Sequence, residues 1–307
     1  MTGRNINVNL AGIELQTPVL AASGPFGYGH EYRRLLDMSA LGGIIVKGIS
    51  AEPWPGNPPP RLVETAGGML NSVGLQNPGL AAFLSDHLPR LQDLQCRLIV
   101  NIVGRTEEEY ASVAEGLDGA PGISGLELNI SCPNLKAGGM AFGTDAAATY
   151  SVVSAVRKRT SLPLLVKLSP NVTSLPAIAS AAEAAGADAL SLINTLSGML
   201  IDTAGRKPLL GNVFGGLSGP AIMPVALKMV WQAAESCRIP ILGMGGIASA
   251  DHALQFIMAG ATAVAVGTGI FYDHDLPAQI VRGIKQYMAA NNIASLQSLV
   301  GAARKGA

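Results

Sequence analysis

Residues 125–134 read Gly-Leu-Glu-Leu-Asn-Ile-Ser-Cys-Pro-Asn, and a glycine-rich run, Lys-Ala-Gly-Gly-Met-Ala-Phe-Gly, follows at residues 136–143. The first part has the alternating apolar pattern of a short buried strand that ends at Asn129. Cys132 and Asn134 come next, in a segment whose composition predicts little regular structure. A strand that delivers reactive side chains into a loop is how α/β barrels present their catalytic groups.

The rest of the chain repeats a unit of one short apolar strand and one helix. The predicted strands cover residues 19–23, 43–47, 98–101, 126–130, 164–167, 189–193, 241–244 and 263–267. The predicted helices cover residues 31–38, 78–91, 106–117, 145–159, 175–185, 220–236, 249–259 and 276–291. Near-continuous apolar strands are typical of a parallel sheet that is buried on both faces. Strand–helix units in this number predict a TIM (β/α)8 barrel, with a doubly wound α/β sheet as the alternative.

A hairpin and two long loops complete the predicted architecture. Residues 6–18 alternate as two short strands around a turn, and we expect this β-hairpin to plug the barrel floor. Residues 50–77 and 195–219 are too long for plain strand–helix loops. Both follow strands, so both are expected over the catalytic face at the carboxyl ends of the strands. No linker separates these parts, so residues 1–307 are predicted to form one barrel domain.

The composition excludes several classes of protein. The 307 residues are 49% hydrophobic and 14% charged, with Lys+Arg 21 against Asp+Glu 21. We expect no nucleic-acid binding from a neutral chain without basic runs, whereas so few charges favour burial against a partner or a second copy. Cys96, Cys132 and Cys237 lie far apart, so neither a disulfide nor a metal site is predicted. We read no signal peptide and no membrane span, and we expect a cytoplasmic protein.

Polar residues gather where the predicted strands end, which is where barrel enzymes carry out their chemistry. The strand-end set is Ser23, Lys47, Asn101, Asn129 with Cys132, Lys167, Asn194 with Thr195, Gly245 with Gly246, and Gly267 with Thr268. Each has an ordinary explanation by itself, because asparagine forms turns and lysine is usually solvated. Asparagines and lysines that converge on one face instead favour a binding site.

Glycine turns after the last two strands predict a phosphate site. Gly245-Gly246 and Gly267-Thr268 would expose backbone N–H groups just before helices, as the phosphate-binding loops of barrels do. Tight turns that need positive φ would select the same glycines. The predicted ligand is a phosphorylated substrate or flavin mononucleotide (FMN).

The two strand-end lysines bear on this choice. A cation beside the pyrimidine end of a flavin would stabilise its reduced form, which suits Lys47 or Lys167. A Schiff-base role for Lys167, in a non-redox phosphate-binding lyase or isomerase, is the competing hypothesis.

The asparagines and Cys132 bear on the substrate. Asn71, Asn129, Asn134 and Asn194 suit a flat, neutral, amide-edged ring such as a pyrimidine. Cys132 is either a small buried hydrophobe or a general base in a loop that excludes water. A scaffold without catalytic activity is the third hypothesis, which the asparagines and Cys132 disfavour.

Several short motifs lie at these strand ends and in the two long loops. They occupy residues 22–27 (Ala-Ser-Gly-Pro-Phe-Gly), 46–48 (Val-Lys-Gly), 71–79 (Asn-Ser-Val-Gly-Leu-Gln-Asn-Pro-Gly), 129–134, 166–170 (Val-Lys-Leu-Ser-Pro), 193–195 (Ile-Asn-Thr), 215–219 (Gly-Gly-Leu-Ser-Gly) and 243–247 (Gly-Met-Gly-Gly-Ile). In this order they resemble the dihydroorotate dehydrogenases, over essentially the whole chain. The resemblance implies an FMN-binding barrel that oxidises dihydroorotate to orotate in pyrimidine biosynthesis.

The loop residues suggest a class within that family. Cys132, in place of the serine base of the membrane-associated class, resembles class 1, and residues 131–143 and 74–78 look like its B type. That type is the catalytic subunit of a heterotetramer, a homodimer core joined by two electron-transfer subunits that carry FAD and a [2Fe–2S] cluster and reduce NAD⁺. The sequence has neither an iron–sulfur cysteine cluster nor a GxGxxG fingerprint, so a partner would have to bind NAD⁺. The fumarate-using A type, a homodimer, is the alternative.

The resemblance also implies a role for each site residue. Cys132 would take the proton from C5 of dihydroorotate while hydride leaves C6 for N5 of the flavin. The substrate would contact Lys47, Asn71, Ser72, Val73, Gly74, Leu75, Asn129, Asn134, Asn194 and Thr195. The flavin ring and ribityl chain would contact Ser23, Lys47, Gly48, Asn101, Asn129, Lys167 and Ile193. Its phosphate side would contact Gly219, Gly245, Gly246, Gly267 and Thr268.

Overall fold

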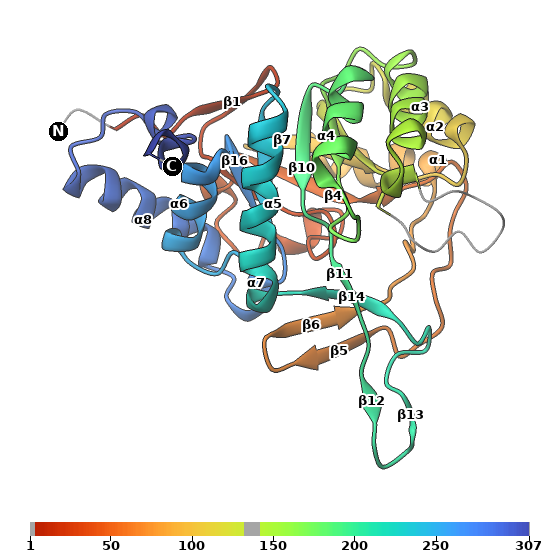
Figure 1. The fold of residues 1–307 in the computed structure, drawn as a ribbon. Helices are drawn as coiled ribbons and strands as arrows, with labels where there is room; N and C mark the ends of the chain where they lie inside the picture. The colour runs from red at the N-terminus through yellow and green to blue at the C-terminus, as the bar shows by residue number, and fades with distance from the viewer. Residues whose placement is uncertain (1–3, 132–141, 307) are drawn as a thin grey trace.

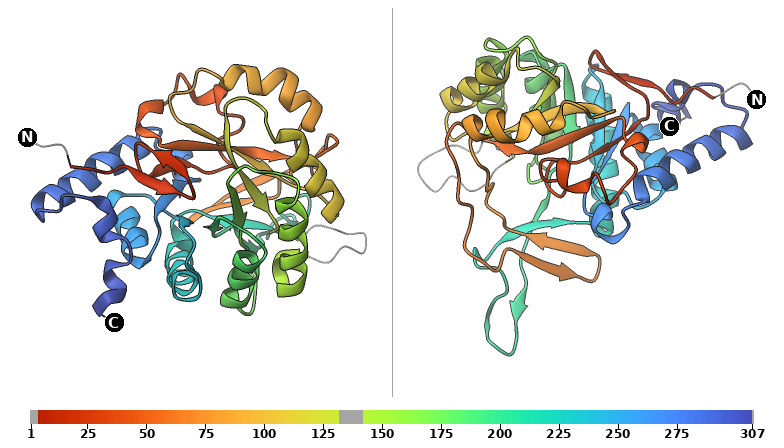
Figure 2. Two further views of the ribbon diagram at one scale, coloured as in Figure 1. Left: turned by 90° about the horizontal axis from the view of Figure 1, so that it is seen from above. Right: turned by 180° about the vertical axis from the view of Figure 1, so that it is seen from behind.

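A computed structural model describes residues 4–131 and 142–306 of the chain. Within these residues, eight parallel strands close into a barrel that helices surround (Figures 1 and 2). In order around the barrel the strands are β3 (Val19–Ala21), β4 (Gly43–Ile49), β7 (Arg97–Ile102), β8 (Ile123–Asn129), β9 (Leu164–Lys167), β10 (Ala189–Leu192), β15 (Ile241–Met244) and β16 (Ala263–Val266). The last strand pairs with the first, Val264 opposite Val19. The predicted TIM barrel is confirmed, and the doubly wound sheet is excluded.

The barrel forms because its strands are apolar at nearly every position. Every residue of β9, β10, β15 and β16 is buried. One face of each strand packs into the barrel interior and the other packs against the surrounding helices, as parallel strands in such folds require.

Helices follow most of the strands, at positions close to those predicted. They are α2 (Glu107–Leu117), α3 (Ala146–Arg157), α4 (Leu175–Ala184), α5 (Met223–Ser236), α6 (Ala250–Ala259), the short α7 (Gly269–Tyr272) and α8 (Leu276–Ala290). The side chains of Thr106, Asp145 and Ser249 cap α2, α3 and α6 by accepting a backbone N–H. The predicted helix at residues 78–91 is a composite of α1 (Leu80–Ala82), a π-helical turn (Phe83–His87) and a 3-10 turn (Leu88–Leu91).

The predicted helix over residues 31–38 is wrong. The segment forms two 3-10 turns instead, at His30–Tyr32 and Met38–Ala40. The Glu31 carboxylate accepts the backbone N–H of Tyr28 at 3.2 Å, and the Asp37 carboxylate accepts that of Ser39 at 2.9 Å. Such local bonds from side chain to backbone compete with the hydrogen bonds of a helix.

The N-terminal hairpin lies at the amino ends of the barrel strands, as predicted. It pairs β1 (Val8–Leu10) with β2 (Ile13–Leu15). The backbone oxygen of Glu14 accepts Arg97 Nε, from the first residue of β7, at 3.0 Å. Ile13 packs against Gly125, near the start of β8. A Cβ atom added at Gly125 would lie 2.8 Å from Cδ1 of Ile13.

The two long loops pair with each other, which the sequence analysis did not predict. The first contributes β5 (Leu62–Thr65) and β6 (Gly68–Asn71), and the second contributes β11 (Leu196–Gly198) and β14 (Gly215–Ser218). These strands form an antiparallel sheet in the order β11-β14-β6-β5, here called the loop sheet, which projects from one end of the barrel (Figure 1). A further hairpin, β12 (Ile201–Asp202) with β13 (Lys207–Pro208), extends beyond it.

Candidate active site

A cavity of about 710 Å³ lies between the carboxyl ends of the barrel strands and the loop sheet. Its volume is typical of a small-molecule site. The cavity is lined by every described residue that was predicted to bind substrate or cofactor: Ser23, Lys47, Gly48, Asn71, Ser72, Val73, Gly74, Leu75, Asn101, Asn129, Lys167, Ile193, Asn194, Thr195, Gly219, Gly245, Gly246, Gly267 and Thr268. Their individual roles stay predictions. Cys132 and Asn134 lie outside the described residues.

A group of buried polar side chains lies in and directly behind the cavity wall. Lys167 Nζ donates to Ser23 Oγ at 3.2 Å and to Glu127 Oε1 at 3.3 Å, and Asn101 Nδ2 donates to the same Oε1 at 2.6 Å. Ser191 Oγ donates to Glu127 Oε2 at 2.9 Å. These contacts fix the lysine and the amide by hydrogen bonds to a carboxylate, so both reach the cavity in defined positions.

Sequence reasoning missed Glu127, because the middle of this strand was read as apolar. One signal could have found it. Side chains two apart on a strand share a face, so Glu127 shares a face with Asn129. A carboxylate on the same face as a candidate ligand, in an otherwise apolar strand, indicates a polar network inside the barrel.

Three of the four asparagines predicted for the substrate lie in the described residues, and they converge from three elements. Asn194 Nδ2 donates to Asn129 Oδ1 at 3.3 Å, and Asn71 Nδ2 donates to the backbone oxygen of Gly216 at 3.2 Å. Tyr110 Oη donates to the backbone oxygen of Asn129 at 2.8 Å and so supports the end of β8 from behind. The amides therefore come from β6, β8 and the segment after β10, and the loop sheet places Asn71 opposite the barrel.

The loop of residues 72–75 is shaped by an asparagine that the sequence analysis also missed. The backbone N–H of Asn57 donates to the Val73 oxygen at 3.1 Å, and Asn57 Nδ2 donates to Ser72 Oγ at 3.0 Å. Gly74 has φ 74°, and a Cβ there would lie 2.5 Å from the Asn57 nitrogen, so only glycine fits. Asn57 lies in a proline-rich stretch without periodicity, and no pattern singled it out.

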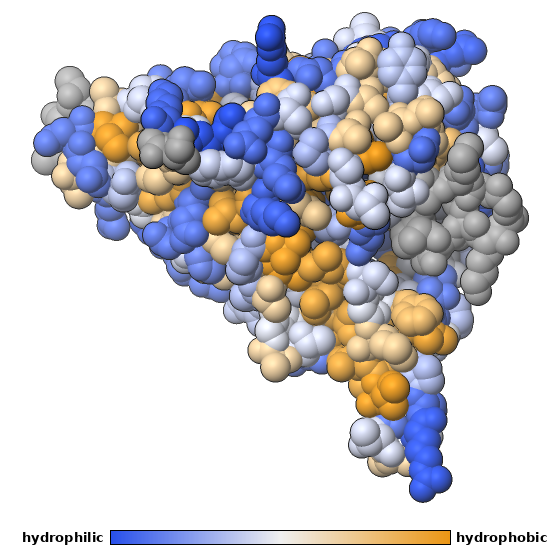
Figure 3. All heavy atoms as spheres, viewed as in Figure 1, coloured by the Kyte–Doolittle hydropathy of each residue, from blue (hydrophilic) through white to orange (hydrophobic). Residues whose placement is uncertain are grey.

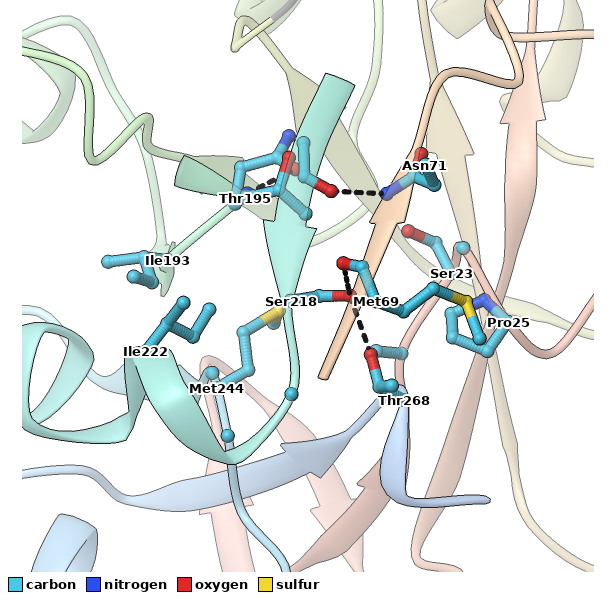
Figure 4. Close-up of a pocket in the computed structure, with 18 of the residues that line it drawn as sticks. Ser23, Pro25, Met69, Asn71, Ile193, Thr195, Ser218, Ile222, Met244 and Thr268 are labelled. Carbon is cyan, nitrogen blue, oxygen red and sulfur yellow. Dashed lines mark hydrogen bonds between the residues drawn. The ribbon is translucent and has the colours of Figure 1, made fainter. Parts of the chain in front are cut away.

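Apolar side chains give part of the cavity a flat wall. Ile193, Ile222 and Met244 lie on one side of it, opposite Ser23 and Pro25 (Figure 4). A planar ring system suits such a slot, because apolar side chains cover its faces while polar groups meet its edge.

The other end of the cavity is lined by glycine turns. Gly219, Gly245 and Gly246 all have positive φ, and a Cβ at Gly246 would lie 2.8 Å from the Gly219 oxygen. Gly219 leads into a 3-10 turn, Pro220–Ile222, and then into α5, whose start has no side-chain cap. Thr268 Oγ1 donates to Ser218 Oγ at 2.8 Å beside these turns. A helix start next to closely packed glycines attracts anions, so this end fits a phosphate.

Lys47 is a half-buried cation in the lining of the cavity. Its backbone N–H donates to the Gly27 oxygen at 2.8 Å. Burial lowers the pKa of its ammonium group, and the nearby charge of Arg61 lowers it further, whereas Glu31 raises it. An anionic ligand would relieve both effects, so Lys47 is suited to contact a carboxylate.

Comparison with known proteins agrees with this geometry. The family model for dihydroorotate dehydrogenase matches residues 5–288. The catalytic subunit of dihydroorotate dehydrogenase B (NAD(+)) from Geotalea uraniireducens is 54% identical over 298 residues, which is 97% of this chain and 98% of the relative. The subunit of the same name from Alkaliphilus oremlandii is 54% identical over 301 residues, 98% of this chain and 99% of the relative. With similarity over nearly the full length of both chains, this protein belongs to the dihydroorotate dehydrogenase family.

Proposed function

We propose that this chain oxidises dihydroorotate to orotate in cytoplasmic pyrimidine synthesis, as the catalytic subunit of a B-type, NAD⁺-linked dihydroorotate dehydrogenase. The observation that carries the proposal is the single cavity that collects all the described residues predicted for substrate and cofactor. The names of the relatives support the same activity.

The donor set of the cavity fits FMN. Its apolar wall with Ile193 and Met244 suits a planar ring, the buried pair Asn101 and Lys167 suits a polar ring edge, and the glycine turns near α5 suit a phosphate. Bound FMN would supply a hydride acceptor, N5 of its ring.

The remaining chemistry falls to this chain's own side chains. Asn71, Asn129 and Asn194 are proposed to hold the amide edges of the substrate ring, and Lys47 to pair with its carboxylate. Cys132 is proposed to take the C5 proton as the C6–H bond gives up its hydride. The ordinary pKa of a cysteine thiol is about 8.5, so cysteines supply thiolate, a competent base, within reach of neutral pH.

A partner subunit is part of the proposal. We propose a heterotetramer whose partner carries FAD and a [2Fe–2S] cluster and reduces NAD⁺; the words "catalytic subunit" in the relatives' names support a second chain. Exposed apolar side chains gather on and beside the loop sheet, and Figure 3 shows apolar surface over this part of the molecule: Leu62, Met199, Ile201, Val213 and Phe214. A contiguous apolar surface of this kind favours contact with another chain.

The surroundings of Lys167 argue against the lyase alternative. A Schiff-base lysine must lose its proton, which an apolar or cationic neighbourhood promotes. Lys167 instead donates to a carboxylate and to a hydroxyl. Both contacts occupy the ammonium group as a hydrogen-bond donor, which suits a cofactor contact better than a nucleophile.

Flavin bleaching tests the proposed activity. After reconstitution with FMN, the purified protein should absorb blue light, as oxidised flavins do. Dihydroorotate should bleach this absorbance under anaerobic conditions. A protein that binds no FMN, or whose flavin stays oxidised with dihydroorotate, would contradict the proposal.

The electron acceptor needs a separate assay. The B type predicts that the chain reduces NAD⁺ only with an iron–sulfur flavoprotein partner. Efficient turnover with fumarate by the chain alone would identify the A type instead.

A further inference from the structure

Glu127 is a buried carboxylate that the proposed chemistry does not use. Its side chain has no solvent exposure, and the residue is absent from the cavity wall. It lies on β8 between two apolar neighbours, Leu126 and Leu128. Burying a carboxylate costs free energy unless donors surround it, so its contacts should reveal why it is present.

Three side chains among the described residues donate hydrogen bonds to the Glu127 carboxylate. Oε1 accepts Asn101 Nδ2 at 2.6 Å and Lys167 Nζ at 3.3 Å, while Oε2 accepts Ser191 Oγ at 2.9 Å. Two of these donors, Asn101 and Lys167, line the cavity, and Ser191 does not. The carboxylate thus stands directly behind two groups that face the ligand.

The carboxylate also decides which way the Asn101 amide points. A carboxylate only accepts hydrogen bonds, so the NH₂ group of Asn101 must turn toward it and the amide oxygen must turn away. That oxygen lies against Gly48, where a Cβ would be 2.8 Å from it, so glycine leaves it uncovered. Asn101 then offers an acceptor at the cavity wall, near the ammonium donor of Lys167.

We propose that Glu127 is a positioning residue for the FMN ring, resting on the function proposed above. It holds an amide oxygen and an ammonium group side by side, an acceptor and a donor that match the N–H and C=O of a flavin pyrimidine edge. It also offsets part of the positive charge that Lys167 presents. Glu127 thereby sets how strongly the site prefers reduced over oxidised FMN, without touching the cofactor.

The variant Glu127→Gln separates charge from shape. It removes the negative charge at nearly constant volume, and it leaves the charge of Lys167 uncompensated. Reduced FMN carries more negative charge, so its affinity should rise relative to that of oxidised FMN, by about tenfold. This ratio corresponds to a midpoint potential about 30 mV more positive for a two-electron couple. A glutamine NH₂ group that faces the NH₂ group of Asn101 gives it no acceptor, so the Asn101 amide loses its fixed orientation. Oxidised FMN should therefore bind several-fold more weakly.

Ser191→Ala is the matched control. It removes a donor from the same carboxylate but leaves Lys167, Asn101 and the cavity wall intact, so the potential should stay at the wild-type value. Glu127→Asp is the second variant, for use if the glutamine variant does not fold. It keeps the charge but withdraws it from Lys167 and Asn101, so the potential should shift in the same direction by a smaller amount.

Midpoint potentials of bound FMN and titrations of the apo-protein with FMN give the two readouts. An unchanged or lowered potential in folded Glu127→Gln, or in folded Glu127→Asp where only that variant folds, would overturn the positioning role. An equal shift of the midpoint potential in Ser191→Ala would mean that any disturbance of the barrel interior has this effect. That result would also overturn the positioning role of Glu127. Wild-type protein that binds no FMN would instead contradict the proposed function, so the two failures are distinguishable.

Discussion

The position of Lys47 was predicted from the sequence, but its lowered pKa follows only from the structure. Its place at a strand end was readable from the apolar run before it. Its half-buried state and the neighbouring charge of Arg61 were not, because Arg61 reaches it from the first long loop. These surroundings lower the pKa of Lys47 below its ordinary value of 10.5.

The lowered pKa predicts how substrate affinity depends on pH. Lys47 is charged below its folded pKa, so its attraction for the substrate carboxylate is complete there and is lost as pH rises through that pKa. We expect KM for dihydroorotate to climb on the alkaline side, starting below pH 10.5. Arginine stays charged throughout, so Lys47→Arg should shift this rise to higher pH.

Steady-state kinetics at a series of pH values check this prediction. The KM profile reports Lys47, whereas kcat reports the proton acceptor. An alkaline rise in KM that is identical in wild type and Lys47→Arg would assign the titration to another group.

Cys132→Ser tests the proposed base. A serine hydroxyl ionises far less readily than a thiol and supplies almost no anionic base at neutral pH, so turnover there should fall by about 100-fold or more, with FMN binding unchanged. Cys96→Ser is the control, because burial raises the pKa of Cys96 to about 11 and leaves it no part in proton transfer at neutral pH. Rapid-mixing measurement of flavin reduction is the assay, and loss of FMN from Cys132→Ser would make the cysteine structural.

Secondary structure was predictable wherever a local pattern determines it. The barrel strands are continuous apolar runs, and α2 begins at a threonine cap followed by acidic residues. The loop sheet was not predictable, because its strands are only three or four residues long and mostly exposed or half-buried. Their pairing joins Asn71 to Gly216 across 145 positions. Residues 31–38 were mispredicted for the opposite reason, since local side-chain bonds override a helical composition there.

The same limits apply to the site. Strand ends and glycine turns identified the cavity wall, because barrel topology brings all strand ends together. Glu127 and Asn57, which support the wall from behind, were not predicted from the sequence. A supporting residue is defined by what it contacts, and those contacts come from other elements.

Asn57→Ala should loosen the substrate loop without affecting the cofactor. The change removes two side-chain hydrogen bonds, to the backbone oxygen of Ser72 at 3.2 Å and to its Oγ at 3.0 Å. A net loss of about 1–2 kcal/mol in loop stability predicts a KM raised by about 5- to 30-fold, with little change in FMN affinity.

Gln92→Ala is the matched control for this variant. Gln92 also donates its side-chain amide to a backbone oxygen, that of Pro121 at 2.9 Å, but it does not line the cavity. Its KM should equal that of the wild type. A KM for Asn57→Ala within twofold of the control value would mean that the loop holds its shape unaided.

For the whole molecule, FMN should act as a stabilising ligand. A ligand that binds only the folded state adds about 2.7 kcal/mol at a concentration 100 times Kd. For a chain of this size that corresponds to a rise in Tm of about 4 °C. Thermal unfolding of apo- and FMN-loaded protein measures the difference, and coincident unfolding curves would exclude tight binding to the native state.

We assign the apolar surface beside the loop sheet to the contact between the two copies of this chain in the homodimer core of the proposed heterotetramer. Ile201 is 57% exposed and Leu35 is 54% exposed, so a lysine at either position fits the fold of a single chain. Ile201→Lys should lower the molar mass in solution, measured by light scattering, whereas Leu35→Lys should leave it unchanged. An unchanged mass for Ile201→Lys would place the contact elsewhere.

The pairing of β16 with β3 constrains how this protein is made in the cell. Val19 leaves the ribosome 245 residues before Val264, its neighbour across the barrel seam (264 minus 19). At about 5–20 residues per second the first strand waits on the order of tens of seconds for that partner. Throughout this interval β3 has one unpaired apolar edge, which is an aggregation hazard. Yield of native protein should therefore depend on translation speed and on chaperones that shield this edge.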